Sequence, residues 1–259
     1  MKSIVSFDLD MTLLDHAAYQ IPQSAMDAIE KLRENHYIVL ATGRDMDNHY
    51  SCRFRDMIRA DAIIHNNGTR ITVGDEVIYE SRMAKELIQG ILDFARRENL
   101  AVGVTIGDED YYTHPEQVTE HDLNRWGESG RRYFDPQKLV DMKVRTLAYI
   151  GKPEGAGKLE KAFPELKCPL FAGLQGADVL ERKNSKANGL LRLCEYFGTD
   201  IKEAYAFGDS MNDFEILQTA GTGIAMGNAV PELKEIADYV TADIADDGVY
   251  KACKHFGLI

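Results

Sequence analysis

The fold is decided by Ile4-Val5-Ser6-Phe7-Asp8-Leu9-Asp10-Met11-Thr12-Leu13-Leu14. This stretch begins as an apolar run of β-branched and aromatic residues, which predicts a short buried strand. Asp8 and Asp10 stand where the strand should end, and burying unpaired carboxylates costs free energy without a structural gain. In open α/β sheets, ligands bind just beyond the carboxyl ends of strands. We therefore interpret the two aspartates as a site for a metal ion and a phosphate group, in preference to the start of an ordinary turn.

The composition limits the classes of protein to which the chain can belong. Its 259 residues are 44% hydrophobic and 28% charged, which is typical of a globular protein with one large domain or two. The net charge of -12 argues against a nucleic-acid partner, because such binding relies on Lys and Arg. It also means that an anionic substrate needs local positive charge or a cation. No apolar run approaches the length of a membrane span, so we expect no membrane partner.

The cysteines and the N-terminus indicate where the protein works. Four isolated cysteines predict neither a zinc site nor disulfides; they are Cys52, Cys168, Cys194 and Cys253. The chain reaches its first strand without a signal peptide. We therefore expect a cytoplasmic protein, as a monomer or a weak homodimer.

The segment after the first strand predicts a parallel sheet. Pro22 is well placed to begin a helix that runs to about Asn35, and 37–41 is a second buried strand that ends in Thr42-Gly43-Arg44. A strand, a helix and a strand in this order form a right-handed crossover with parallel strands. Because both strands then end at the same edge, we expect Thr42 to lie near Asp8.

Further elements complete the first part of this core. The pattern predicts a helix near 47–58, a third strand at 60–65, an Asn-Gly turn at 66–68, and a hairpin of 70–73 with 76–79.

From about Ser81 the pattern changes to short strands and scattered helices. Helices are expected at 83–98, 116–126, 136–142 and 156–163, and strands at 101–106, 111–113, 145–150, 168–172 and 178–181. We interpret residues 81–184 as a separate α+β insert. Trp126, Tyr111 and Tyr112 are expected to pack within it.

The crossover pattern returns after the insert. Ser185 is expected to cap a helix that ends before Gly198, and strands follow at 203–207 and 222–226, with helices from 231 and at 247–255. The core is therefore split into 1–80 and 185–259. An insert with two connections, placed beyond the sheet edge, would act as a lid that excludes water.

A later strand also ends in acidic residues, and these can complete a metal site with Asp8. Asp209, within Gly208-Asp209-Ser210-Met211-Asn212-Asp213, can share one hard cation with Asp8. Mg²⁺ suits this set, because it takes oxygen ligands and commonly one or two carboxylates plus a substrate phosphate. Thr42 and Lys186 can offer a hydroxyl and a fixed positive charge to that phosphate.

Four motifs in order around the insert resemble those of the haloacid dehalogenase (HAD) superfamily: Asp8-x-Asp10-x-Thr12, Thr42-Gly43-Arg44, Lys186, and Gly208-Asp209-Ser210-x-Asn212-Asp213. Asn67-Gly68 and Met226-Gly227-Asn228-Ala229 further resemble the Cof-type, class IIB branch. The resemblance implies an α/β fold: a Rossmannoid core with a parallel sheet and helices on both faces, plus an inserted α+β class II cap.

The resemblance also implies roles. Asp8 would be the nucleophile that forms an aspartyl-phosphate, and Asp10 the general acid and base. Asp8, the carbonyl of Asp10, and Asp209 would hold Mg²⁺, with Thr12 in support. Asp213 would either orient these ligands or be a further partner of the metal. The residues expected to bind the phosphoryl group are Leu9, Thr42, Gly43, Lys186 and Asn212.

Met11 departs from the family pattern, which commonly has glycine there. Glycine relaxes backbone limits, so Met11 is expected to tighten the loop or narrow the entrance without abolishing the chemistry.

The expected function is a Mg²⁺-dependent phosphatase for small phosphorylated metabolites such as sugar phosphates. A phosphomutase or a phosphatase for one sugar remains an alternative, and so does a module that senses phosphate without turnover. The intact Asp10 argues for turnover, since it has no role in mere binding. The substrate depends on insert residues; His114, Glu116, His121 and Arg125 are candidates that are expected to be surface residues.

Overall fold

The chain divides into two compact units in the computed structural model, which describes residues 2–48, 51–171 and 173–259. The first unit is built from Met1–Glu80 and Asn184–Ile259, and the second from Ser81–Lys183. Each unit has its own hydrophobic core.

The first unit is organised on a mixed sheet with a parallel centre. In the described part of the chain its strand order is β13-β12-β11-β1-β2-β3-β4-β5. The strands are β1 (Ser3–Phe7), β2 (His36–Ala41), β3 (Ala62–His65), β4 (Arg70–Val73), β5 (Glu76–Glu80), β11 (Tyr205–Gly208), β12 (Thr222–Ala225) and β13 (Tyr239–Val240). The strands from β13 to β3 are parallel, whereas β4 and β5 form the expected antiparallel hairpin at one edge.

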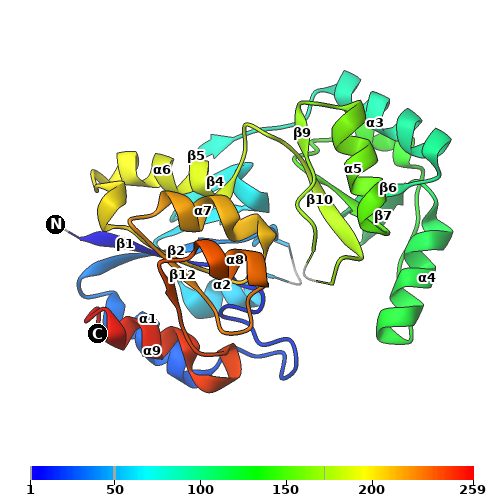
Figure 1. Cartoon of the computed structure of the whole chain (residues 1–259). Coiled ribbons are helices and arrows are strands. Elements are labelled where there is room, and N and C mark those ends of the chain that lie inside the picture. Colours follow the sequence, from blue (N-terminus) through cyan, green and yellow to red (C-terminus); the bar gives the residue numbers. More distant parts are fainter. Residues whose placement is uncertain (1, 49–50, 172) are drawn as a thin grey trace. The chain divides into compact units, whose positions relative to one another are not determined.

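Helices cover both faces of this sheet, with α1 and α9 on one face and α6 and α7 on the other (Figure 1). The helices are α1 (Gln23–Leu32), α2 (Cys52–Ile58), α6 (Lys186–Phe197), α7 (Phe214–Thr219), α8 (Pro231–Ile236) and α9 (Gly248–His255). Short 3-10 turns are η1 (Asn66–Gly68), η3 (Ile201–Glu203), η4 (Met211–Asp213) and η5 (Ile244–Asp246).

Local chemistry sets the ends of α6. The Ser185 side chain accepts a hydrogen bond from the Asn188 N–H, which satisfies one of the free donors of the first turn. Gly198 follows the last turn in the left-handed conformation, with φ 67°. The cap and the stop expected from the sequence are both confirmed.

The second unit is an antiparallel sheet in the order β7-β6-β8-β10-β9. Its elements are α3 (Lys85–Glu98), β6 (Ala101–Ile106), β7 (Glu109–Tyr112), α4 (Pro115–Trp126), η2 (Pro136–Asp141), β8 (Leu147–Ile150), α5 (Pro153–Ala162), β9 (Leu166–Lys167) and β10 (Gly176–Glu181). Helices α3 and α5 bury their apolar faces in one cluster with the sheet, while Val118 of α4 packs in another. The α/β core and the α+β insert are thus as the sequence predicts.

Several local predictions were wrong. The helix expected near 47–58 begins only at Cys52, and residues 49 and 50 lie outside the described residues. The segment expected as a helix at 136–142 is the 3-10 turn η2. The strand expected at 168–172 is replaced by β9 at Leu166–Lys167, and residue 172 lies outside the described residues.

The aromatic residues of the insert divide into two groups. Tyr111 and Tyr112 are buried as expected. Trp126, expected to pack, is 65% exposed at the end of α4, where Arg125 lies over its ring. The prediction that Trp126 packs in the core, which rested on the usual burial of aromatic residues, is therefore wrong.

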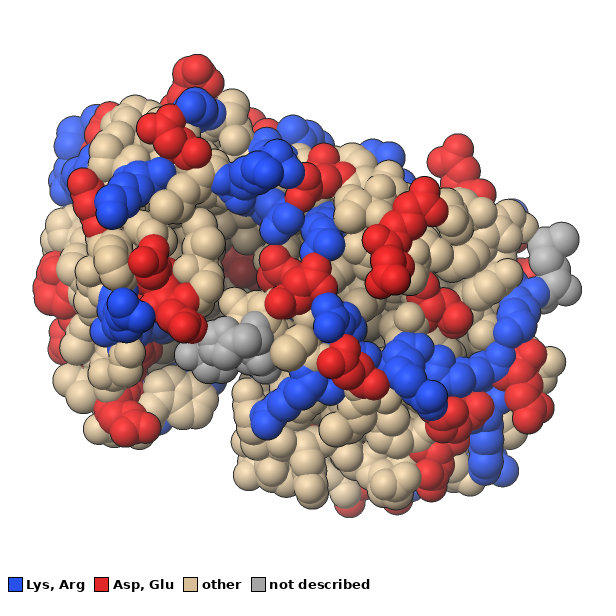
Figure 2. All heavy atoms as spheres, turned by 180° about the vertical axis from the view of Figure 1, so that it is seen from behind, with Lys and Arg blue, Asp and Glu red and all other residues tan. Residues whose placement is uncertain are grey.

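The surface and the thiols agree with the composition. Acidic and basic side chains are interspersed over the face drawn in Figure 2. Within the described residues, none of the four cysteines forms a disulfide. Among the described residues, no helix has both the length and the apolar character needed to cross a membrane.

Candidate active site

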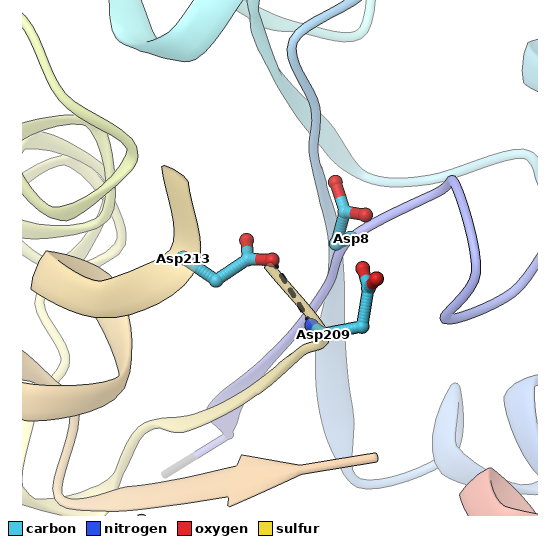
Figure 3. A group of neighbouring side chains, drawn as sticks. All are labelled: Asp8, Asp209 and Asp213. Carbon is cyan, nitrogen blue, oxygen red and sulfur yellow. Dashed lines mark hydrogen bonds between the residues drawn. The ribbon is translucent and has the colours of Figure 1, made fainter. Parts of the chain in front are cut away.

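Parallel pairing brings the acidic strand ends together. Phe7 of β1 is in register with Phe207 of β11, so the residues that follow both strands emerge at the same edge of the sheet. There, carboxylate oxygens of Asp8, Asp209 and Asp213 lie within 4.8 Å of one another (Figure 3). All three side chains are buried.

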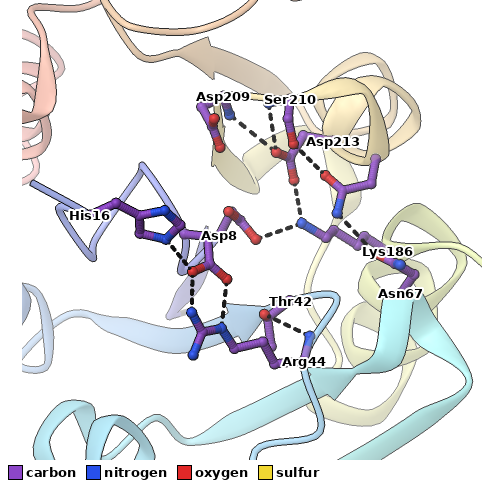
Figure 4. Close-up of polar contacts among 11 residues, drawn as sticks. Asp8, His16, Thr42, Arg44, Asn67, Lys186, Asp209, Ser210 and Asp213 are labelled. Carbon is purple, nitrogen blue, oxygen red and sulfur yellow. Dashed lines mark hydrogen bonds and ion pairs between the residues drawn. The ribbon is translucent and has the colours of Figure 1, made fainter. Parts of the chain in front are cut away.

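Lys186 is the positive charge inside this cluster. It is fully buried in the first turn of α6. Its Nζ donates to Asp8 Oδ1 and to Asp213 Oδ1, both at 2.6 Å (Figure 4). The ammonium group thus bridges two strand-end segments that are far apart in the chain.

Asp213 is held on both of its oxygens. Oδ1 binds Lys186, while Oδ2 accepts from the backbone N–H groups of Asp209 and Ser210, at 3.1 and 3.2 Å. Asp209 differs, because its carboxylate receives no hydrogen bond within the described residues. The oxygens that remain open to a cation are therefore those of Asp209 and the second oxygen of Asp8.

This buried cluster contains three carboxyl groups, those of Asp8, Asp209 and Asp213, and one ammonium group, that of Lys186. Burial raises the pKa of Asp8 to about 7, while Lys186 opposes the rise and Asp213 adds to it. Burial also raises the pKa of Asp209 well above its usual range, and the charge of Asp8 adds to this effect. Oxygen donors with an unbalanced negative charge fit a hard divalent cation such as Mg²⁺.

Asp10 lies in a different environment from Asp8. Arg44 donates to it from Nε at 2.8 Å and from a terminal nitrogen at 2.5 Å, and His16 Nε2 donates at 2.7 Å. Burial alone would raise the pKa of Asp10, but the hydrogen bonds from His16 and Arg44 lower it to about 2. Its carboxylate is therefore ionised, and the His16 ring and the Arg44 guanidinium, both labelled in Figure 4, hold it in place.

The structure also describes the residues expected to bind a phosphoryl group. Thr42 is buried at the end of β2, and its Oγ1 accepts from the Arg44 N–H. Neither the Leu9 nor the Gly43 N–H has an acceptor within the described residues, so both remain able to donate. Asn212 lies in η4, and a Cβ placed on Gly43 would be 3.6 Å from its Nδ2. These donors accompany Lys186 at the same edge.

Thr12 stands apart from these contacts. It is fully buried, but its Oγ1 has no hydrogen-bond partner among the residues that the structure describes. Of the four candidate substrate contacts on the insert, Glu116 and Arg125 are exposed, while His114 and His121 are partly buried.

Sequence reasoning missed several residues that the structure brings to this edge. It assigned no role to Arg44, His16 or Ser210, and it used Asn67 only as part of a turn and of the resemblance to the class IIB branch. Arg44 and Asp10 are 34 residues apart, and Asn212 and Asn67 are 145 apart. Only the position of Arg44 directly after Thr42-Gly43, at the expected strand end, could have indicated its contact.

A family model described as haloacid dehalogenase-like hydrolase matches residues 5–253. The chain belongs to this family, in its class IIB branch, and it is a phosphatase.

Particular relatives agree with this class. YkrA of Bacillus subtilis is 32% identical over 100% of this chain and 99% of YkrA. HMP-PP phosphatase of Klebsiella pneumoniae is 28% identical over 99% of this chain and 94% of its own length. The solved structure of the HAD subclass IIB sugar phosphatase BT4131 superposes with a TM-score of 0.88 at 28% identity, covering 100% of both chains.

Proposed function

We propose that the protein hydrolyses small phosphorylated metabolites, sugar phosphates foremost, in a Mg²⁺-dependent reaction through an aspartyl-phosphate on Asp8. The observation that carries the proposal is the buried Lys186, which holds one oxygen of Asp8 at 2.6 Å beside the open carboxylate of Asp209. A fixed cation that positions a carboxylate at a strand end is suited to nucleophilic attack on a phosphoryl group.

In the first step, the Asp8 oxygen would form a bond to phosphorus as the bond to the leaving oxygen breaks. The departing oxygen takes a proton from Asp10. In the second step, water attacks the phosphorus of the aspartyl-phosphate and gives its proton back to Asp10, which releases inorganic phosphate and restores Asp8. Lys186, Asn212 and the N–H groups of Leu9 and Gly43 would hold the equatorial oxygens.

The contacts of Asp10 set a condition on this sequence. Its carboxylate is ionised in the arrangement seen here, which is the form that acts as a base. To act as an acid it must carry a proton, so it must leave Arg44 and His16 when substrate binds. Release from these two donors would raise its proton affinity.

Asp8, Asp209 and the carbonyl of Asp10 would hold the metal ion. A bound Mg²⁺ would supply positive charge that favours ionised Asp8 and offsets repulsion between the cluster and a phosphate dianion. Asp213 is better suited to fixing Lys186 and the Asp209 backbone, because both of its oxygens are already occupied.

The relatives support a small substrate, since one is named for HMP-PP and another is described as a sugar phosphatase. We infer that the insert, Ser81–Lys183, selects the leaving group. The cytoplasmic location and the monomer or weak homodimer stay predictions from the sequence.

The test is release of inorganic phosphate from a panel of sugar phosphates, with Mg²⁺ and with EDTA. Wild type should turn over only with Mg²⁺, and Asp8→Asn should lose at least about a thousandfold in rate, because it removes the nucleophile. Asp15→Asn, in the same loop but outside the cluster, is the matched control. An isomerised product without phosphate release would instead indicate a phosphomutase, and binding without any turnover a sensing module.

A further inference from the structure

The turn η1 touches two segments that are expected to bind phosphate. The Asn67 N–H donates to the Thr42 carbonyl at 3.0 Å, which joins the turn to the end of β2. Gly68 packs so closely on the cap of α6 that a Cβ there would lie 2.1 Å from the Ser185 carbonyl oxygen. Lys186 follows that cap directly. The turn η1 therefore contacts both the segment that contains Thr42 and the segment that contains Ser185 and Lys186.

The Asn67 side chain reaches a third segment. Asn212 Nδ2 donates to Asn67 Oδ1 at 3.1 Å, and the Ser210 hydroxyl donates to Asn212 Oδ1 at 2.8 Å. Asn67 is only 3% exposed, so water does not compete freely for this contact. A Cβ on Gly43 would lie 3.4 Å from Asn67 Nδ2 and 3.6 Å from Asn212 Nδ2, which places both amides beside the phosphate-binding loop.

We propose that Asn67 is a positioning residue that fixes the amide of Asn212, so that the second N–H of Asn212 is aimed at the bound phosphoryl group. The inference rests on the proposed function and adds a residue to it.

The physical reason lies in the donors and acceptors of the amide. An asparagine side chain has two N–H donors and one acceptor oxygen. One N–H of the Asn212 amide donates to Asn67 Oδ1, and the amide oxygen of Asn212 accepts from the Ser210 hydroxyl. These two hydrogen bonds fix the orientation of the Asn212 amide and leave its second N–H to donate to a ligand. A donor held before the ligand arrives binds more tightly than one that must be ordered on binding. A neutral donor also adds no charge to the acidic cluster.

The backbone of Asn67 allows a clean deletion. Its φ of 53° is in the left-handed region, which glycine adopts without strain. Asn67→Gly therefore removes the side chain and keeps the turn. Asn66 is the matched control, because it also has a left-handed φ, 47°, and its Oδ1 has no hydrogen-bond partner in the described part of the chain.

The experiment measures the Kd of inorganic phosphate in the presence of Mg²⁺ for wild type, Asn67→Gly, Asn212→Ala and the double variant. Asn67→Gly should weaken binding about tenfold, which is the size of one lost oriented hydrogen bond. Asn67→Gly should add little in the Asn212→Ala background, because both changes remove the same donor. Asn66→Gly should stay within about twofold of wild type.

Three results would overturn the inference. The first is unchanged phosphate affinity in Asn67→Gly, and the second is a wild type that does not bind phosphate. The third is a double variant whose loss of affinity equals the product of the losses in the two single variants. Such independent losses of affinity would mean that Asn67 affects the fold and does not act through Asn212. If the wild type binds phosphate but hydrolyses no ester, the proposed function is wrong, while the inference about Asn67 still stands or falls on the binding data. The coupling between Asn67 and Asn212 would still be measured by binding.

Discussion

Asp8 and Asp10 are two residues apart, yet their surroundings push their pKa values in opposite directions. Asp8 is buried among other carboxylates, and this burial raises its pKa to about 7 although Lys186 opposes the shift. Asp10 faces Arg44 and His16, whose hydrogen bonds outweigh burial and lower its pKa to about 2. Pairs of carboxylates with separated proton affinities are common where one side chain attacks and another moves protons.

The raised pKa of Asp8 predicts a cost in stability. The folded state holds the proton more tightly than an unfolded chain with the ordinary pKa of 3.8, so stability falls as pH rises from about 4 to about 7. Asp8→Asn should therefore stabilise the metal-free protein by a few kcal/mol (order of magnitude) at pH 8, and by less at pH 5. Urea unfolding at both pH values measures this, with Asp15→Asn as control. Equal or lower stability at pH 8 would contradict it.

Met11 has a backbone reason for being unusual. Its φ is 59°, in the region where a Cβ costs about 1 kcal/mol, and its carbonyl accepts from Asn228 at 2.7 Å. Met11→Gly should stabilise the protein by up to about 1 kcal/mol in urea unfolding, while Met11→Ala, which keeps the Cβ, should not. A gain of the same size in both variants would show that the side chain, and not the backbone, is responsible.

The site is predictable from the sequence only in part. That Asp8 and Asp209 end neighbouring strands follows from the alternation of strands and helices, and the structure brings both to one edge. The clamp of Arg44 on Asp10 and the contact of Asn67 with Asn212 depend on side-chain directions in loops. No local periodicity specifies those directions.

At the scale of elements, caps and turns were the clearest signals. Ser185, Gly198 and the Gly74-Asp75 turn mark boundaries that the structure confirms, because each works through contacts within a few residues. The start of α2 was misjudged because Asp45 competes locally: its Oδ1 accepts from the Asp47 N–H at 3.1 Å and stabilises a turn there.

The packing of η1 against α6 predicts an intolerant glycine. Gly68→Ala would place a Cβ 2.1 Å from the Ser185 carbonyl oxygen at a φ of 90°, so we expect a loss of more than about 3 kcal/mol together with weaker phosphate binding. Gly74→Ala, at φ 53° with no atom of a described residue within 4 Å of its Cβ, should lose only about 1 kcal/mol. Equal losses in chemical denaturation would argue against the close contact.

At the scale of the whole molecule, the insert leaves the core and returns to it at neighbouring points. The Tyr79 hydroxyl donates to Asn184 Oδ1 at 2.9 Å, across the two connections. The core cluster of the first unit contains no residue of Ser81–Lys183. The first unit therefore has the apolar contacts to fold by itself.

Replacing 81–183 with a short Gly-Ser linker tests this independence. We expect a cooperative thermal transition, a mixed α/β circular dichroism spectrum and retained binding of inorganic phosphate with Mg²⁺, because every residue expected to bind phosphate lies in the first unit. Discrimination between sugar phosphates should be lost. An unfolded or aggregated product would mean that the core depends on the insert.

The nucleophilic role of Asp8 is the central claim, and a covalent intermediate tests it most directly. Wild-type protein should be mixed with Mg²⁺ and a substrate found in the panel, quenched in acid during turnover, and digested for peptide mass spectrometry. We predict a phosphoryl group on Asp8, and none in Asp8→Asn. A phosphoryl group on another residue, or turnover in Asp8→Asn at the wild-type rate, would contradict the account.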